Sequence, residues 1–154
     1  MDRVAAVGST GALILSDLIR RARAVDATKK KYGPKVFNWR QGSTCIHMAR
    51  SHLVQMGHRP PSLPRIRSLL SARKALKESG WANVEAMLDA QAGLIRIAPA
   101  EMLLGDIAVL ASEDGIGAIF ICAGPHKLIG WREDHPTLVV LDLSFDQISG
   151  AWRA

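Results

Sequence analysis

The sequence lacks the features that define several protein classes. It has only two cysteines, Cys45 and Cys122, and their wide separation excludes a zinc-binding spacing and a dense disulfide framework. No run of about 18 apolar residues is present, so we expect no membrane-spanning helix. We find no internal repeat and no low-complexity segment. The small number of cysteines favours synthesis in a reducing compartment.

The remaining composition is that of one globular domain with polarised charge. Hydrophobic residues make up 48% of the 154 positions and charged residues 22%, close to the globular average. The net charge of +6 is unevenly distributed along the chain. Residues 1–77 carry 16 Lys/Arg and 3 Asp/Glu, whereas residues 78–154 carry 4 and 11. Opposite patches of this kind favour docking against complementary partners.

Helical periodicity dominates the first 90 residues. Apolar residues recur at helical spacing from Thr10 to Val25, and Gly33-Pro34 ends any helix in this region. A Gly-Ser-Thr turn supplies capping chemistry for a second helix from Thr44 to about Met56. Three prolines between positions 60 and 64 predict an extended loop. Two short helices follow it, at Leu69–Glu78 and Val84–Ala90.

After Gly105 the pattern changes to short runs of β-forming residues separated by Gly, Pro and Asp. These runs predict an antiparallel meander of about five strands. Helices followed by strands are typical of an α+β domain. The predicted strands lie at 106–110, 118–122, 127–131 and 138–143 and in the tail at 151–153.

Cys45 is the first candidate for chemistry. It lies at the predicted start of a helix, where free backbone N–H groups and the helix dipole stabilise a thiolate. Arg40 and His47 are near it in sequence and could add positive charge. A cysteine nucleophile needs this arrangement, but a buried small apolar residue at a helix start has the same pattern. The residues alone leave both interpretations open.

A cysteine nucleophile also needs a histidine base. His47 points roughly 200° around the helix from Cys45, and His52 is nearly two turns along it, too far to reach the thiol. His126, at a predicted hairpin tip, is a weak candidate base that could swing in from the hairpin. No pattern indicates a metal or a cofactor. The five histidines are His47, His52, His58, His126 and His135.

Several short motifs, taken in order, resemble a small phage and prophage family related to the NlpC-type cell-wall cysteine peptidases. The resemblance implies a papain-like α+β fold, with amino-terminal helices packed on a carboxy-terminal antiparallel sheet. It spans about residues 36–154, so residues 1–35 are predicted to be a basic amphipathic arm that packs on a partner chain. The motifs are Phe37-Asn38-Trp39, Thr44-Cys45, Met56-Gly57-His58-Arg59, Gly105-Asp106 with the strand after it, and Ala151-Trp152-Arg153.

The chain departs from the family pattern at two points. Where the family places Asp before its Cys, this chain has Thr44. The resemblance implies a catalytic His at the start of the strand after the Gly-Asp strand, but Ile116 or Gly117 stands there and neither accepts a proton. Loss of a general base removes about 10²–10⁴-fold in rate. We therefore expect a peptidase-like fold in which Cys45 is an inefficient or inactive nucleophile.

The resemblance also implies a role. Peptidase-like domains of this kind belong to the tail tip of long-tailed phages, so we expect a structural or assembly component of the hub or baseplate region. Such a protein is made in the bacterial host cytoplasm, carried in the virion and bound to other tail-tip proteins.

Two alternatives stay open. One is an active peptidase or amidase that cleaves peptidoglycan, with Cys45 as nucleophile and His126 as base. The other is a nucleic-acid-binding protein that uses the basic amino-terminal half. Because that half lacks interleaved aromatic residues, nucleic acid is the less favoured partner.

Overall fold

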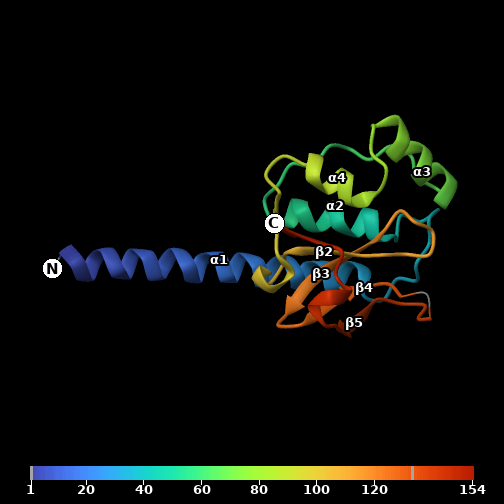
Figure 1. Cartoon of the computed structure of the whole chain (residues 1–154). Coiled ribbons are helices and arrows are strands. Elements are labelled where there is room, and N and C mark those ends of the chain that lie inside the picture. Colours follow the sequence, from blue (N-terminus) through green and yellow to red (C-terminus); the bar gives the residue numbers. More distant parts are fainter. Residues whose placement is uncertain (1, 133) are drawn as a thin grey trace.

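The computed structural model describes residues 2–132 and 134–154. Within them, four α-helices precede a six-stranded sheet (Figure 1). The helices are α1 (Asp2–Tyr32), α2 (Cys45–Gln55), α3 (Leu69–Glu78) and α4 (Val84–Ala90). The strands are β1 (Ile95–Ile97), β2 (Ile107–Leu110), β3 (Ala118–Gly124), β4 (Lys127–Gly130), β5 (Val139–Asp142) and β6 (Gly150–Arg153). Two 3-10 helices, η1 (Pro99–Glu101) and η2 (Phe145–Gln147), complete the chain.

The sheet is antiparallel and has the strand order β1-β6-β2-β3-β4-β5. Strands β2 to β5 form the predicted meander, and the tail strand β6 returns to pair with β2. In this register Ile107 lies opposite Ile121 on one side and Trp152 on the other. The edge strand β1 was not predicted, because a three-residue Ile-Arg-Ile run carries too little alternation to stand out.

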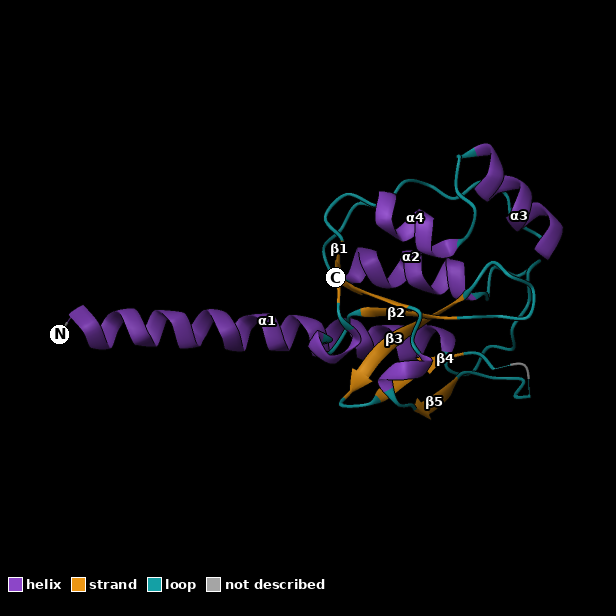
Figure 2. Ribbon diagram, viewed as in Figure 1, coloured by secondary structure: helices purple, strands orange, loops and turns teal. Residues whose placement is uncertain are grey.

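Different residues pack on the two faces of the sheet. Along β3, Ile119 and Ile121 face the helices, whereas Phe120 and Cys122 belong to an apolar cluster with Leu128, Leu141 and Ile148. Helix α2 lies against both α1 and β3, as the ribbon in Figure 2 shows. The main core joins α1, α2, α3 and α4 to the helical face through Ala24, Ile46, Leu53, Leu76, Leu88, Ile107, Ile119 and Trp152.

Local capping explains why the last three helices begin where the sequence predicts. The side chains of Thr44, Ser68 and Asn83 each accept a hydrogen bond from the backbone N–H three residues later. Ser71 completes a capping box with Ser68 at the start of α3. Each cap satisfies a backbone group that the first turn of a helix leaves unpaired, so these boundaries follow from short-range sequence.

Helix α1 is longer than predicted at both ends and has two different halves. From Arg21 to Tyr32 it packs on the domain, and its last turn continues through the lysine run up to Gly33-Pro34. Its amino-terminal half extends away from the other elements (Figure 1) and exposes apolar side chains. A domain boundary after residue 35 stays a prediction. The exposed side chains are Leu13, Ile14, Leu15, Leu18 and Ile19.

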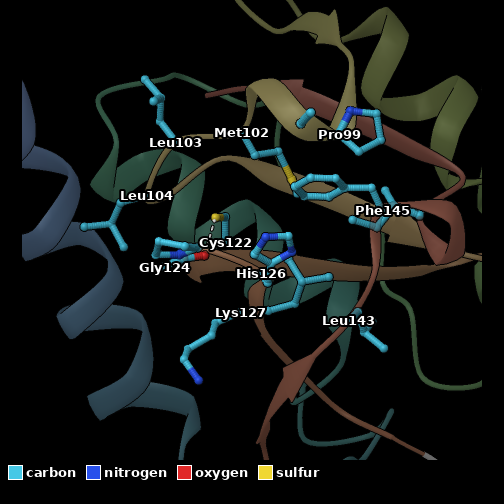
Figure 3. Close-up of a pocket in the computed structure, with 14 residues that line it drawn as sticks. Pro99, Met102, Leu103, Leu104, Cys122, Gly124, His126, Lys127, Leu143 and Phe145 are labelled. Atoms are coloured by element: carbon cyan, nitrogen blue, oxygen red, sulfur yellow. Dashed lines mark hydrogen bonds between the residues drawn. The ribbon is translucent and has the colours of Figure 1, made fainter.

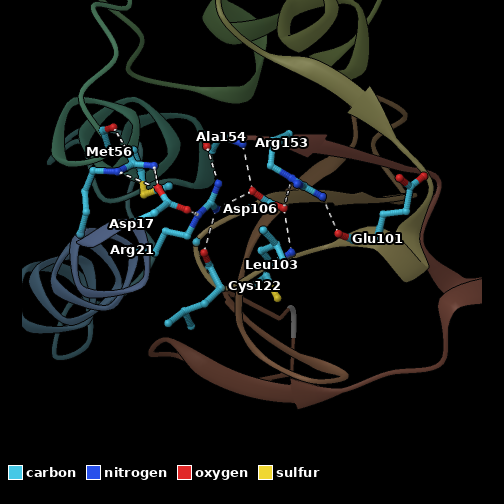
Figure 4. Close-up of polar contacts among 12 residues, drawn as sticks. Asp17, Arg21, Met56, Glu101, Leu103, Asp106, Cys122, Arg153 and Ala154 are labelled. Carbon is cyan, nitrogen blue, oxygen red and sulfur yellow. Dashed lines mark hydrogen bonds and ion pairs between the residues drawn. The ribbon is translucent and has the colours of Figure 1, made fainter. Parts of the chain in front are cut away.

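Asp106 ties α1 and the tail strand to the start of β2 (Figure 4). Its carboxylate is fully buried and accepts hydrogen bonds from Arg21 Nη1 and Arg153 Nε, each at 2.9 Å. It also accepts from the backbone N–H groups of Leu103 at 2.8 Å and Ala154 at 3.0 Å. A buried carboxylate needs this number of partners. The Asp of the Gly-Asp motif therefore has a structural role.

Candidate active site around Cys45

Cys45 is the first residue of α2, as predicted, and Thr44 is its N-cap. Cys45 lines a cavity of about 320 Å³ between the segment before α2 and the turn that leads into β3. The cavity wall is largely apolar and aromatic, with a few polar side chains at the β3 turn and after β4. Its principal lining residues are Val36, Phe37, Trp39, Leu69, Ser112, Asp114, Ile116, Gly117, Trp131, Arg132 and His135.

Burial determines the protonation state of Cys45. The pKa of the thiol is raised to about 11, chiefly by burial and in smaller part by the nearby negative charge of Asp114. Backbone hydrogen bonds from Ile119 and from the helix start lower the pKa but do not offset burial. The thiolate is the nucleophile, and at pH 7 a thiol with this pKa is ionised in only about one molecule in 10⁴.

The positive charges expected beside Cys45 lie elsewhere. Arg40 and His47 line a neighbouring hollow and not the cavity of Cys45. His47 bonds through Nδ1 to Thr44 Oγ1 at 2.7 Å, and burial lowers the pKa of its ring. The helix N-terminus is present as predicted, but the second condition for a stabilised thiolate, an adjacent cation, is not met by these two residues.

The turn before β3 occupies the position where the resemblance places a catalytic histidine. Ile116 and Gly117 line the same cavity as Cys45. The turn is held by Asp114, which accepts from the Ile116 N–H at 3.1 Å, and by Ser112, which accepts from the Gly117 N–H at 3.0 Å. Neither Ile116 nor Gly117 can take a proton from the thiol.

The backbone conformation and the surroundings of Gly117 also disfavour any side chain at its position. Its φ of +92° is in the left-handed region, which L-residues rarely adopt. A Cβ added there would lie 2.8 Å from Val84 Cγ2 and 3.1 Å from Val109 Cγ1, both in the core. A histidine at this position would therefore require the packing of β2 against α4 to change.

The structure does not bring His126 and Cys45 together. His126 lies in the turn between β3 and β4 with a φ of 57°, and its ring stacks on Phe145 at a centroid distance of 4.6 Å. It lines a second cavity, of about 410 Å³, together with Met102 and Cys122 (Figure 3). This cavity and the one around Cys45 share no lining residue. His126 would have to leave its stack to approach the thiol.

His135 is the histidine that shares the cavity of Cys45, although the sequence analysis counted it among the five histidines without choosing it as the base. Its Nδ1 lies 3.3 Å from Asp134 Oδ1, and this contact contributes to the lowered pKa of that carboxyl. The side chain of His135 is 55% exposed. Only the Asp-His pair itself could have drawn attention to it, and such pairs are common in solvated turns.

Among the residues that the structure describes, no cluster of three or more His, Cys, Asp and Glu side chains is placed to hold a metal ion. None of the described helices combines the length and the apolar character needed to cross a bilayer.

Comparison with known proteins places this chain in a family. A family model described as "Domain of unknown function (DUF6950)" matches residues 18–154. The chain belongs to this family. No curated protein matches it. The match to DUF6950 begins within α1, before the buried residues Arg21, Ala24 and Val25.

A solved structure gives the fold of this DUF6950 member. The P60 domain from the M. avium paratuberculosis antigen MAP1272c superposes with a TM-score of 0.56 and 11% sequence identity. The similarity covers 91% of this chain and 96% of that chain. The predicted α+β, papain-like NlpC-type fold is thereby confirmed. At this identity the likeness concerns the fold alone, and a phage origin stays a prediction.

Proposed function

We propose that this DUF6950 protein is a structural or assembly component of a long-tailed phage tail tip, in the hub or baseplate region, and has a degenerate peptidase site. The observation that carries the proposal is the state of Cys45. Cys45 is partly buried in the wall of its cavity, and desolvation raises the pKa of its thiol to about 11, so the thiol is protonated at pH 7. It shares this cavity with Ile116 and Gly117, where an active relative would present a histidine. The tail-tip location rests on the resemblance of short motifs to a phage and prophage family.

Two independent losses argue against efficient hydrolysis. The thiolate fraction of about 10⁻⁴ at pH 7 reduces the concentration of the nucleophile. The absence of a base at the start of β3 removes about 10²–10⁴-fold from proton transfer. Because a side chain at Gly117 would strain the backbone and overlap Val84 and Val109, a histidine substituted there would not be held as a base without repacking of the core.

The exposed half of α1 supports a role in assembly. Leu15, Leu18 and Ile19 lie on one face of the helix by their spacing and are between 42% and 59% exposed. Contiguous exposed apolar side chains of this kind mark surfaces that bind other proteins. Other hub or baseplate proteins are the partners that the tail-tip role requires.

Labelling of purified phage particles tests this location. A phage that encodes the chain with a carboxy-terminal epitope tag is produced, and its virions are labelled with antibody-coated gold. The expected result is label at the cell-facing end of the tail, and particles without a tail tip when the gene is deleted. Label on the head, or virions that lack the protein, would contradict the proposal.

A second candidate function, a cysteine peptidase or amidase acting on peptidoglycan, is favoured by one observation. His135 lines the cavity of Cys45 and carries Asp134 at its Nδ1, an arrangement that can orient an imidazole base. Release of soluble fragments from purified peptidoglycan separates the two functions. The tail-tip proposal predicts no release above buffer by the wild-type protein.

Three variants identify the machinery if release does occur. A peptidase built on this cavity loses activity in Cys45→Ala and in His135→Ala. His126→Ala is the matched control, since His126 lines a different cavity. Activity that depends on His126 and not on His135 would instead support the pairing of Cys45 as nucleophile with His126 as base.

A further inference from the structure

A concave basic surface lies beside the cavity of Cys45. We call it the basic hollow; its volume is about 570 Å³. Four segments form it: the end of α1, the turn before α2, the outer side of α2, and the loop before α3. Its charged and titratable lining residues are Lys31, Arg40, His47, Arg50, Arg65 and Arg67.

The cations of the basic hollow have no acidic partner within the described residues. The hollow has no Asp or Glu in its lining, and none of its five Lys and Arg side chains takes part in an ion pair there. Two of them make neutral contacts: Arg50 Nε donates to the Pro61 carbonyl at 2.9 Å, and Lys31 Nζ donates to Ser51 Oγ at 3.2 Å. Cations that line one hollow repel one another unless an anion lies among them.

The acidic half of the sequence does not supply a matching surface, because much of its charge is already neutralised. Asp106 is buried between Arg21 and Arg153. Arg96 pairs with both Glu85 and Asp89. A second copy of this chain is therefore a poor partner for the hollow, although the charge totals of the two sequence halves suggested complementary docking.

Aromatic rings stand in the wall of the hollow, although the basic sequence runs have none interleaved. Tyr32 and Trp39 both line it. Trp39 is only partly buried, and Phe37 holds its ring edge-to-face at a centroid distance of 5.5 Å. A fixed and partly exposed indole beside cations is the arrangement on which bases of a single strand stack.

We propose that the basic hollow binds the phosphate backbone of single-stranded nucleic acid, with Trp39 as a stacking surface for a base. Protein interfaces have few charged residues at their centres, whereas nucleic-acid interfaces are strongly positive and polar. The planar guanidinium groups of Arg40, Arg65 and Arg67 suit bidentate binding of phosphate. This inference does not depend on the tail-tip proposal and can hold whether or not that proposal does.

Fluorescence anisotropy of a labelled oligothymidylate of about 20 nucleotides, over a series of salt concentrations, tests the proposal. For the wild-type protein, the logarithm of affinity should fall linearly with the logarithm of salt concentration. The triple variant R40Q/R65Q/R67Q should bind at least about tenfold more weakly at 0.1 M salt. Its slope should be lower by about 2, since each neutralised phosphate of a single strand contributes about 0.7.

A matched control distinguishes binding at the basic hollow from binding through the net positive charge of the protein. The variant R59Q/K74Q/K77Q removes the same number of exposed cations, none of which lines the hollow. It should keep its affinity within about twofold and keep the wild-type slope. Equal loss in both triple variants would overturn the proposal, because binding would then follow net charge and not this site.

Two further measurements complete the test. Poly-glutamate at the same charge concentration should not displace the oligonucleotide; full displacement would assign the hollow to an acidic protein and overturn the proposal. Thermal unfolding shows whether the triple variant R40Q/R65Q/R67Q is folded. If it is not, Arg65→Gln replaces it, because Arg65 is exposed and forms no hydrogen bond through its side chain among the described residues. That single variant should lower the slope by about 0.7, and an unchanged slope would count against the hollow.

Discussion

The cavity of Cys45 and the basic hollow lie side by side at the amino-terminal end of α2 and share Trp39, yet they have opposite character. The first is lined mainly by apolar and aromatic residues, and its burial keeps the Cys45 thiol protonated. The second is open and gathers cations without an acidic residue. The comparison teaches that two neighbouring hollows of one fold can differ sharply: burial holds a thiol protonated in one, whereas the other presents unpaired cations to solvent.

The largest expected effect comes from forcing a histidine into the Cys45 cavity. Gly117→His should lower the free energy of unfolding by about 3 kcal/mol, since the side chain adds backbone strain and overlaps Val84 and Val109. It should not produce peptidoglycan hydrolysis. Urea unfolding followed by tryptophan fluorescence measures the loss. A Gly117→His protein as stable as wild type would show that the packing around β3 is looser than described.

A smaller expected effect is a loss of stability at acidic pH, and it comes from His52, the buried histidine of α2. His52 Nε2 donates to the Gly105 carbonyl at 2.8 Å, so Nδ1 accepts from the Thr28 hydroxyl at 2.9 Å. Burial lowers the pKa of His52, with a further lowering from Arg21 and an opposing contribution from Asp106. The native state therefore favours the neutral ring.

Because the native state favours the neutral ring of His52, acidification lowers the free energy of unfolding. The stabilisation that comes from keeping His52 neutral is fully present above pH 6.5, which is about the pKa of a histidine in the unfolded chain. It is lost as the pH falls below that value. Each unit between the unfolded and folded pKa values contributes about 1.4 kcal/mol. Unfolding free energies measured from pH 7.5 to 5 should decline, and the His52 ring should titrate below pH 6.5 by NMR. His47 and His58, whose pKa values are also lowered, contribute to the same decline.

The His52→Gln variant is the control for this pH dependence. It should be less stable than wild type at pH 7.5 and lose less on acidification, because the buried titrating group is gone. An NMR titration of His52 at or above pH 6.5 would contradict its assignment as a neutral buried ring.

The smallest expected effect lies in the basic hollow. Arg65→Gln should change the free energy of unfolding by no more than about 0.5 kcal/mol, because Arg65 is exposed and makes no described ion pair. The same urea unfolding measurement as for Gly117→His gives a direct contrast between the two sites. A loss above about 1 kcal/mol would indicate that Arg65 holds the loop before α3 in place.

Short-range chemistry explains how much of the fold was predictable. The caps Thr44, Ser68 and Asn83 act within one helical turn, so three helix starts could be assigned from neighbouring residues alone. The meander followed from turn residues between β-forming runs, and its order is confirmed for β2 to β5. The tail strand β6, predicted as a fifth strand of the meander, pairs instead with β2 and β1. The edge strand β1 was not predicted, because it is stabilised by pairing with β6, whose residues are far away in the sequence.

The site was less predictable because its properties depend on tertiary structure. The start of β3 beside Cys45 followed from the resemblance, and Ile116 and Gly117 do line its cavity. The high pKa of Cys45 comes from burial by segments remote in sequence, which no local pattern reveals. The choice of His135 over His126 and the existence of the basic hollow could not be predicted for the same reason, since both depend on segments that meet only in the folded chain.

The pH dependence of Cys45 alkylation tests the central claim most directly. Iodoacetamide labelling of the native protein is followed by peptide mass spectrometry, which separates Cys45 from Cys122. The buried thiol should react about two orders of magnitude more slowly at pH 7.5 than in urea, and its rate should rise with an apparent pKa of about 11. Rapid labelling of Cys45 with an apparent pKa below about 7 would contradict the account and show an activated nucleophile.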